Sequence, residues 1–123
     1  MKISEALAQI DSLLPNTYPQ LDKVRWLSNL DSKVKTLIID THEGGEGVTF
    51  SSYDGTTDLN TELLIPAPFD EIYLRWLEAQ IHLANSEYER HNNAIEGYNT
   101  VWVAYQNYYN RTHMPKGCRF KYF

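Results

Sequence analysis

Four neighbouring residues, Asp40, Thr41, His42 and Glu43, include side chains that could do chemistry. Carboxylates and an imidazole this close together can bind a metal ion or exchange protons with a substrate. Their spacing matches no zinc pattern, and the chain contains no His-Glu-x-x-His motif. A structural role is the alternative, because the helix dipole favours a histidine near a helix C-terminus. A metal-dependent enzyme using Asp40, His42 and Glu43 is one hypothesis.

The other chemical candidates form no recognisable catalytic motif. Gly44-Gly45-Glu46-Gly47 lacks the Lys-Ser/Thr that follows a phosphate loop. His82, His91 and His113 form no i, i+4 pair, and His91 falls on an apolar stripe, which is typical of a hydrogen-bonded interior histidine. Cys118 has no histidine at a spacing known for nucleophiles. We therefore predict that the protein is not an enzyme and has no catalytic residue, metal site or cofactor.

Aromatic residues are the most conspicuous feature, at 13 % of the chain, with nine Tyr and three Trp. These side chains suit protein–protein surfaces because they combine a large apolar area with a polar group. Tyr108 and Tyr109 are adjacent, so on a helix they point about 100° apart and cannot both serve one narrow stripe. A small core rich in aromatic residues is the alternative. The predicted interface residues are Tyr98, Trp102, Tyr105, Tyr108, Tyr109, Phe50 and Tyr53.

The length and composition fit a single helical domain that assembles with other proteins. The 123 residues are 42 % hydrophobic, which is enough for one core. The net charge of −5 argues against nucleic acid as the main ligand, and the basic residues Lys116, Arg119 and Lys121 are interpreted as a short solvated tail. The single cysteine excludes an internal disulfide and fits a reducing cytoplasm. We expect no signal peptide and no membrane partner.

Two helices are predicted in the first 45 residues. Apolar residues at helical spacing over 3–14 predict the first helix, and residues 15–19, with two prolines, predict a turn. The second helix is expected to begin at Pro19 and to end at Gly44-Gly45. Residues 44–64 hold four of the six glycines and an Asp54-Gly55 turn signal, which predicts a small β-hairpin or an ordered loop.

An apolar stripe with a period of 3.5 residues runs from Leu74 to Tyr109. It predicts either one helix of about 44 residues, about 65 Å long, or two helices that fold back on each other. Compactness favours a break, which we place near residues 90–93 because asparagines 92 and 93 tolerate turns. The fold is thus predicted as mainly α, with an N-terminal helical hairpin, a β-hairpin or loop insertion at 44–64, and two long C-terminal helices or one bent helix. Residues 114–123 would form a short flexible tail.

The chain resembles small structural proteins of tailed phages and of prophages in Gram-positive bacteria. The matching stretches are residues 41–45, 63–71, 92–99 and 108–115. The general layout is similar to the head-to-tail connector (adaptor) proteins, which form a ring beneath the portal. The resemblance implies a virion protein without cofactor or active site that joins copies of itself and contacts portal or tail proteins. Phage DNA would pass through without sequence-specific contact.

The hypotheses from the sequence therefore belong to three classes. The first is a ring-forming connector subunit, present in the host cytoplasm during assembly and then in the virion. Adaptor, stopper and tail-completion roles all stay open within it, as do the number of copies and the face that lines the channel. The second is a small phage-encoded helical module that binds a partner protein. The third is the metal-dependent enzyme described above.

Overall fold

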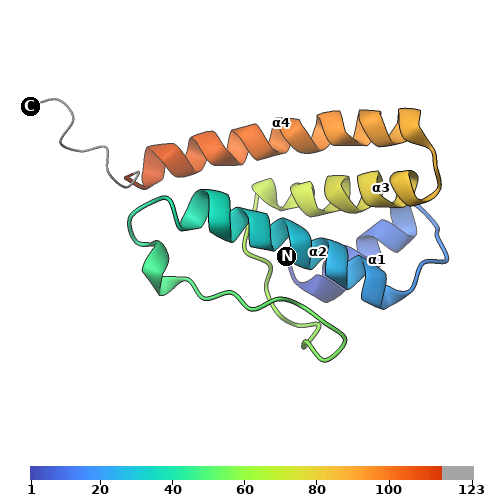
Figure 1. The fold of residues 1–123 in the computed structure, drawn as a ribbon, viewed down its shortest axis with the longest axis horizontal. Helices are drawn as coiled ribbons and strands as arrows, with labels where there is room; N and C mark the ends of the chain where they lie inside the picture. The colour runs from blue at the N-terminus through green and yellow to red at the C-terminus, as the bar shows by residue number, and fades with distance from the viewer. Residues whose placement is uncertain (115–123) are drawn as a thin grey trace, which may run out of the picture.

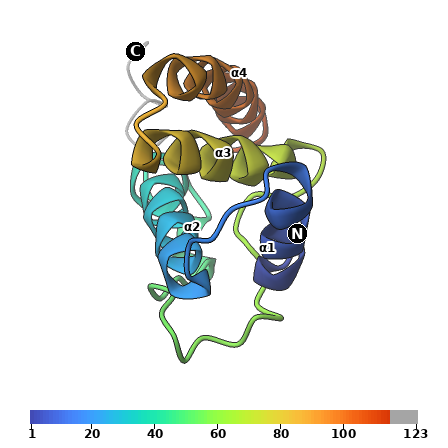
Figure 2. The same ribbon diagram turned by 90° about the vertical axis from the view of Figure 1, so that its right-hand side faces the viewer.

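The computed structural model describes residues 1–114, which form four α-helices in three layers (Figure 1). Figure 2 shows that α4 forms one outer layer, that α3 lies beneath it, and that α1 and α2 form the layer below α3. The predicted mainly helical fold, with an N-terminal helix pair and two long C-terminal helices, is confirmed. The helices are α1 (Ile3–Leu13), α2 (Gln20–Val34), α3 (Ile72–Ala84) and α4 (Tyr88–Thr112).

The predicted turn between the first two helices is closed by a buried lysine. Lys23 on α2 donates from Nζ to Asp11 Oδ1 at 2.6 Å and to Asn16 Oδ1 at 3.2 Å. The hydrogen bond from Lys23 holds the pKa of Asp11 below its ordinary value. Pro19 lies immediately before α2, where its missing N–H costs no hydrogen bond. The start of this helix was therefore predicted to within one residue.

The second helix continues beyond α2 through a π-helical turn, η1 (Lys35–Ile39), and ends before the glycines. Gly44 has a φ of 87°, a left-handed conformation that favours glycine, and it precedes a 3₁₀ turn, η2 (Gly45–Gly47). The predicted helix end at Gly44-Gly45 is thus about five residues late, because the chain leaves the helix at Ile39 and turns through Asp40 to Glu43.

Replacing Gly45 by alanine is expected to destabilise the turn that follows η1. A Cβ at this position would lie 2.3 Å from the carbonyl oxygen of Ile39, and backbone cannot move aside cheaply. We expect the free energy of unfolding to fall by about 1–3 kcal/mol, the range for overpacking a closely packed site. Urea denaturation should show this loss, whereas Gly47→Ala, where a Cβ meets nothing within 4 Å, should change stability little.

The insertion is an ordered loop, and the β-hairpin alternative is wrong. The two runs that were expected to pair with each other form hydrogen bonds with helices instead. Tyr53 N–H donates to Ser28 Oγ on α2 at 3.0 Å, and Leu64 N–H donates to Asp31 Oδ2 at 3.2 Å. A single antiparallel bridge joins Lys2 to Glu62 within the described chain. The first run is thus tied to α2 at Tyr53, and the returning run is tied to α2 and to the N-terminal residues.

The returning half of the insertion accepts hydrogen bonds from the first backbone N–H groups of α1. The first N–H groups of a helix have no partner within the helix itself. Ile3 N–H donates to the Thr61 carbonyl at 3.1 Å, and Ser4 N–H donates to the Leu59 carbonyl at 2.9 Å. Leu63 N–H donates to the Met1 carbonyl at 2.9 Å. Residues 59–63 are therefore joined to the helical body by these hydrogen bonds.

The C-terminal stripe is divided between two antiparallel helices, so the predicted break is confirmed, although it lies earlier than expected. The chain turns at residues 85–87, where Ser86 has a φ of 61° and Glu87 N–H donates to the His82 carbonyl at 2.8 Å. Residues 90–93 instead lie inside α4. A short 3₁₀ turn, η3 (Phe69–Glu71), leads into α3.

The core lies where α1, α2 and α3 meet, and α4 packs on the outer side of α3. Fully buried side chains from each of the first three helices meet residues from the loop. None of the helices within residues 1–114 combines the length and apolar character needed to cross a membrane. The predicted tail lies outside the described residues, except for Met114. The fully buried apolar residues include Ile3, Ile10, Leu27, Leu30, Ile38, Ile65, Ile72, Tyr73, Leu77 and Ile81.

Candidate functional site

The centre of the molecule contains a buried carboxylate, Asp31, whose side chain is 0 % exposed. Tyr53 donates its hydroxyl proton to Oδ2 at 2.6 Å, and Tyr73 on α3 donates to Oδ1 at 2.6 Å. Leu64 N–H donates to Oδ2 at 3.2 Å, and Ile65 N–H donates to the Tyr73 hydroxyl at 2.7 Å. One carboxylate on α2 therefore ties both ends of the loop, at Tyr53 and at 64–65, to the helical body. We call this group the Asp31 network.

Burial governs the protonation of the Asp31 network. Removal from water raises the pKa of Asp31 above its ordinary value, although the hydrogen bonds from Tyr53 and Tyr73 oppose this shift. Burial, followed by the charge of Asp31, also raises the pKa of both tyrosines, so they stay protonated and act as donors. The arrangement is a satisfied polar network that positions a loop.

His42 joins the end of the second helix to the end of α4. Its Nδ1 lies 2.6 Å from the Ile38 carbonyl oxygen, and its Nε2 lies 2.6 Å from Oδ1 of Asn110. Its ring also packs edge-on against Tyr109, with centroids 4.9 Å apart. Next to it, Glu43 N–H donates to the Met114 carbonyl at 2.8 Å. Both ring nitrogens of His42 are thus engaged in joining two helix ends.

The structure does not bring Asp40, His42 and Glu43 together as a set of metal ligands. The exposed Asp40 carboxylate pairs with Lys35, while His42 is buried and hydrogen-bonded as described. Within residues 1–114, no three His, Cys, Asp or Glu side chains gather as a metal site. His91 Nδ1 lies 2.8 Å from the Ala79 carbonyl oxygen on α3, so the predicted hydrogen bond is present, although His91 is half-buried and not interior.

An aromatic cluster with a lysine joins α2, α3 and α4. Lys33 Nζ lies 5.3 Å from the centre of the Trp102 ring and 5.4 Å from the centres of the Trp76 and Tyr98 rings. It also lies 3.1 Å from the Tyr98 hydroxyl oxygen. Trp76 in turn donates from Nε1 to the Trp26 carbonyl at 2.7 Å. An ammonium group near several ring faces gains cation–π stabilisation at each.

A second aromatic cluster lies at the C-terminal end of α4. Phe69 of η3 packs against Tyr105 at 5.6 Å and Tyr108 at 5.1 Å between ring centroids. Tyr109 continues the cluster, 5.9 Å from Tyr105 and 3.9 Å from the stacked ring of His113. Burial raises the pKa of Tyr105, so its hydroxyl stays neutral. The cluster anchors the last turns of α4 to η3 and to the end of the second helix.

The seven predicted interface residues fall into two groups. Tyr53, Tyr98, Tyr105 and Tyr109 are between 2 % and 7 % exposed, so they belong to the core of the chain itself. Sequence reasoning had kept this core packing as the alternative. A partner can reach only the three that are half-buried in the single chain, which are Phe50, Trp102 and Tyr108.

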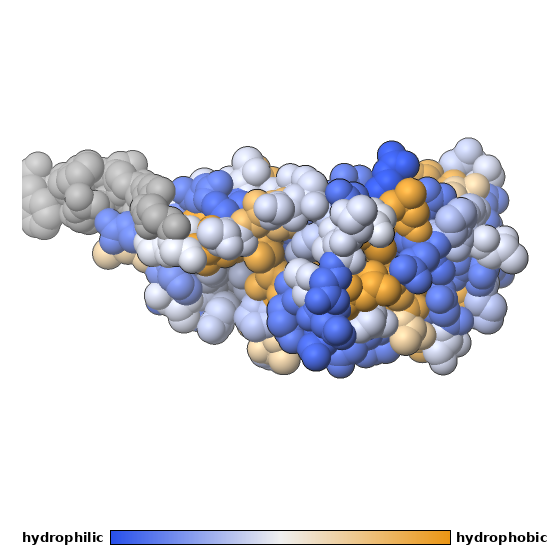
Figure 3. All heavy atoms as spheres, turned by 90° about the horizontal axis from the view of Figure 1, so that it is seen from below, coloured by the Kyte–Doolittle hydropathy of each residue, from blue (hydrophilic) through white to orange (hydrophobic). Residues whose placement is uncertain are grey.

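The surface offers shallow hollows and scattered apolar side chains. The hollows have volumes of about 220–280 Å³, whereas ligand pockets usually hold about 300–1,000 Å³. Figure 3, which views the molecule from the side of the loop, shows apolar patches separated by hydrophilic side chains. Within residues 1–114, the exposed large apolar residues are Leu13, Leu21, Leu37, Leu83, Tyr88, Val103 and Met114.

Comparison with family models, curated proteins and solved structures found no match. The strongest geometric feature is the end of the molecule where His42 meets Asn110, Glu43 meets Met114 and Phe69 meets Tyr108.

The sequence did not lead us to Asp31, the centre of the Asp31 network, or to Lys33, the centre of the aromatic cluster that joins α2, α3 and α4. Asp31 carried a signal, because it lies four residues after Leu27 and three before Val34, on the apolar face of α2. A charged residue at such a position predicts a buried polar network. Lys33 and Trp76 carried no comparable signal, since their meeting depends on how three helices cross.

Proposed function

We propose that this chain is a structural subunit of a phage head-to-tail connector that assembles as a ring at the portal vertex. The single observation that carries the proposal is where the matching stretches lie. Three of the four stretches, residues 41–45, 63–71 and 108–114, are far apart in sequence, yet they meet at one end of the molecule through the contacts of His42, Glu43 and Phe69 described above, whereas residues 92–99 lie inside α4. A shared sequence pattern that forms one surface supports a common role for that surface.

Exposed aromatic area supports a protein-binding role. Trp102 and Tyr108 keep part of their rings on the surface of α4, and Val103 between them is 50 % exposed. Aromatic residues of this kind are enriched in the centres of protein interfaces. The acidic character of the chain, with a net charge of −5, also suits a wall along which DNA passes without being held.

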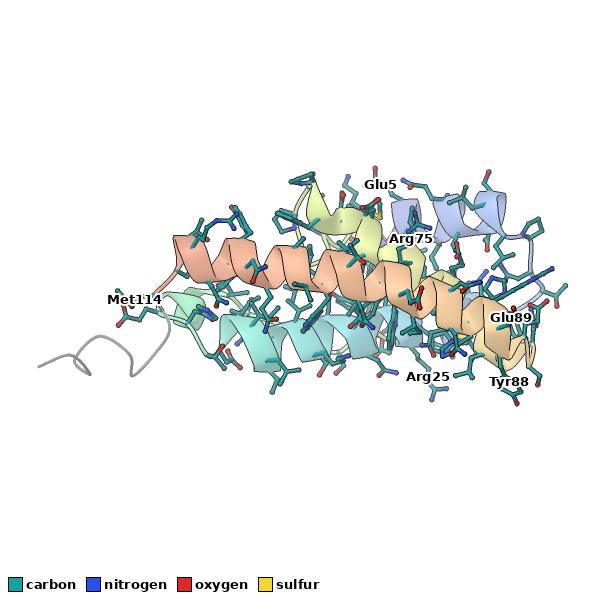
Figure 4. The ribbon with its side chains drawn as sticks, turned by 90° about the horizontal axis from the view of Figure 1, so that it is seen from above. Glu5, Arg25, Arg75, Tyr88, Glu89 and Met114 are labelled. Carbon is teal, nitrogen blue, oxygen red and sulfur yellow. The ribbon has the colours of Figure 1, made fainter. Side chains whose placement is uncertain are left out.

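The test is complex formation with the portal protein of the same phage, measured by light scattering and electron microscopy. We expect rings on the portal, and Tyr108→Ala should weaken binding by tenfold or more while the isolated chain keeps its helical content. Tyr88→Ala is the matched control, because Tyr88 is 63 % exposed at the opposite end of α4 from Met114 (Figure 4).

The result also separates the proposal from its alternatives. If the folded chain fails to bind portal and all neighbouring connector proteins, the proposal is wrong. Tight binding to a host protein without rings would support the partner-binding module instead. Binding that survives Tyr108→Ala unchanged would place the docking surface elsewhere on the chain.

A further inference from the structure

A stretch of extended chain, residues 48–53, lies below α2, and we call it the extended segment (Figure 1). Val48 has strand-like dihedrals, φ −97° and ψ 121°. Residues 49–52 form no backbone hydrogen bond with any residue in 1–114, and three of the four are exposed. A row of free N–H and C=O groups on an exposed strand favours pairing with another strand.

The residues around the extended segment indicate what kind of peptide could bind along it. Residues 36–74 contain eight of the sixteen carboxylates of the chain and none of its eleven Lys and Arg residues. Asp54 follows the extended segment, Glu62 lines the hollow beside it, and Asp58 lies between these two in sequence; all three are exposed. Next to the segment is a hollow of about 230 Å³ whose walls include Phe50, Thr57, Thr61 and Leu64. The complementary partner is an extended peptide that alternates basic and aromatic residues.

The chain itself contains such a peptide. Residues 119–123 read Arg-Phe-Lys-Tyr-Phe, with basic and aromatic side chains alternating at the period of a strand. This stretch lies outside the described residues and follows Met114 by five positions. The sequence of one copy therefore contains both the acidic acceptor and a basic ligand that matches it.

The direction of pairing identifies which copy supplies the peptide. The bond from Glu43 N–H to the Met114 carbonyl places residue 114 beside residue 43, five positions before the extended segment, so residues 119–123 of the same copy are in register to run along residues 48–53 in parallel. An antiparallel pair within one copy would require the five Cα–Cα steps from residue 114 to residue 119, at most about 18 Å when fully extended, to pass the whole extended segment, whose own five steps span about 17 Å, in addition to the distance from residue 43 to its start. Exposed pairs are antiparallel far more often, since parallel sheets are covered on both faces.

We propose that residues 119–123 of a second copy add as an antiparallel strand along residues 48–53 and place an aromatic side chain in the adjacent hollow. The basic side chains then face Asp54, Asp58 and Glu62. This proposal rests on the proposed function, because the ring is part of that proposal. It adds the residues that would join one subunit of the ring to the next. Each copy supplies one ligand and one acceptor, so the contact can repeat around a closed ring.

The first test measures self-association of the full-length chain by light scattering over a range of concentrations. The wild-type chain should associate as its concentration rises, and the K116E/R119E/K121E variant should stay monomeric at the same concentrations. Raising the salt concentration should weaken association of the wild type. The proposal is overturned if the wild type stays monomeric up to its solubility limit, or if the triple variant associates equally well.

The second test locates the acceptor with a synthetic peptide of residues 115–123, in which Cys118 is replaced by serine. The peptide should bind the full-length K116E/R119E/K121E chain in fluorescence anisotropy, and a scrambled peptide of the same composition should bind at least tenfold more weakly. Adding Ser52→Pro should weaken binding at least tenfold, because the N–H of Ser52 points away from the side on which Tyr53 N–H meets Ser28, so proline removes a donor from the free edge. Adding Thr17→Pro is the matched control, since Thr17 is also exposed and its N–H has no partner in 1–114.

Equal binding of both peptides, or equal effects of the two prolines, would contradict the proposed strand. The same variants assayed on the portal separate the two proposals. Loss of self-association with retained portal binding would leave the connector role intact and confirm the strand contact. Portal binding lost while self-association is retained would count against the connector role alone.

Discussion

Replacing Asp31 by alanine is expected to lower the free energy of unfolding by at least about 4 kcal/mol. The carboxylate is fully buried and accepts hydrogen bonds from Tyr53, Tyr73 and the backbone of Leu64. Each buried donor left without an acceptor costs about 1–3 kcal/mol. Because small domains are stable by only about 5–15 kcal/mol, much of the stability would be lost. Urea denaturation followed by circular dichroism measures the effect.

Milder variants keep this prediction testable if the alanine variant does not fold. Asp31→Asn preserves the shape but replaces one acceptor oxygen with a donor, so we expect about half the loss. Tyr53→Phe removes a single donor and leaves Asp31 with its bonds from Tyr73 and Leu64. It should cost about 1–2 kcal/mol. If all three variants were as stable as the wild type, the Asp31 network would have no role in holding the loop.

The pH dependence of stability gives an independent check on Asp31. Burial raises its pKa above the ordinary value of 3.8, so between 3.8 and the raised pKa the folded state binds more protons than the unfolded state. The free energy of unfolding contributed by this group therefore falls as the pH rises through that window. Asp31→Asn lacks this contribution, so its stability relative to the wild type should increase with pH. Parallel pH profiles for the two proteins would show that the pKa of Asp31 is not raised.

Replacing Tyr105 by alanine is expected to cost about 3–5 kcal/mol, the range for removing a large buried aromatic side chain. Tyr105 is 2 % exposed and touches Phe69, Tyr108 and Tyr109. Its loss would open a cavity between η3 and α4 and loosen the end of α4 from the body. Hydrogen exchange should show faster opening of the last turns of α4 than of α1.

Tyr105→Phe is the matched control. Within residues 1–114 the Tyr105 hydroxyl forms no hydrogen bond, so the variant keeps every ring contact and loses no bond there. We expect a change below about 1 kcal/mol, since the packing volume is nearly conserved. A loss as large as that of the alanine variant would mean that the hydroxyl, and not the ring, stabilises this cluster.

Much of the fold could be predicted from local sequence patterns. The prolines at 15 and 19 and the spacing of apolar residues were sufficient to place α1, α2 and the turn between them. The division of the long stripe into two helices followed from compactness. Its position did not, because the asparagines at 92 and 93 face solvent on α4, whereas the actual turn contains Ser86 in a left-handed conformation.

The loop and the clusters could not be predicted from sequence in the same way. Strand-like residues at 48–53 and 62–65 indicated a hairpin, but their hydrogen bonds go to Ser28, Asp31 and the start of α1, which are distant in sequence. The aromatic residues of α4 were assigned to an interface because the N-terminal helices looked too short to cover them. η3 and α3 supply the missing cover through Phe69 and Trp76.

The placement of the three tryptophans gives the protein an intrinsic fluorescence signal for the packing of its helices. Trp26, Trp76 and Trp102 all lie in or beside the Lys33 cluster, on α2, α3 and α4. The loop contains no tryptophan, and it is anchored through Tyr53 and Tyr73. Tryptophan emission thus follows the crossing of the helices and does not directly report the loop. Release of the loop with the helices still packed would leave this emission largely unchanged.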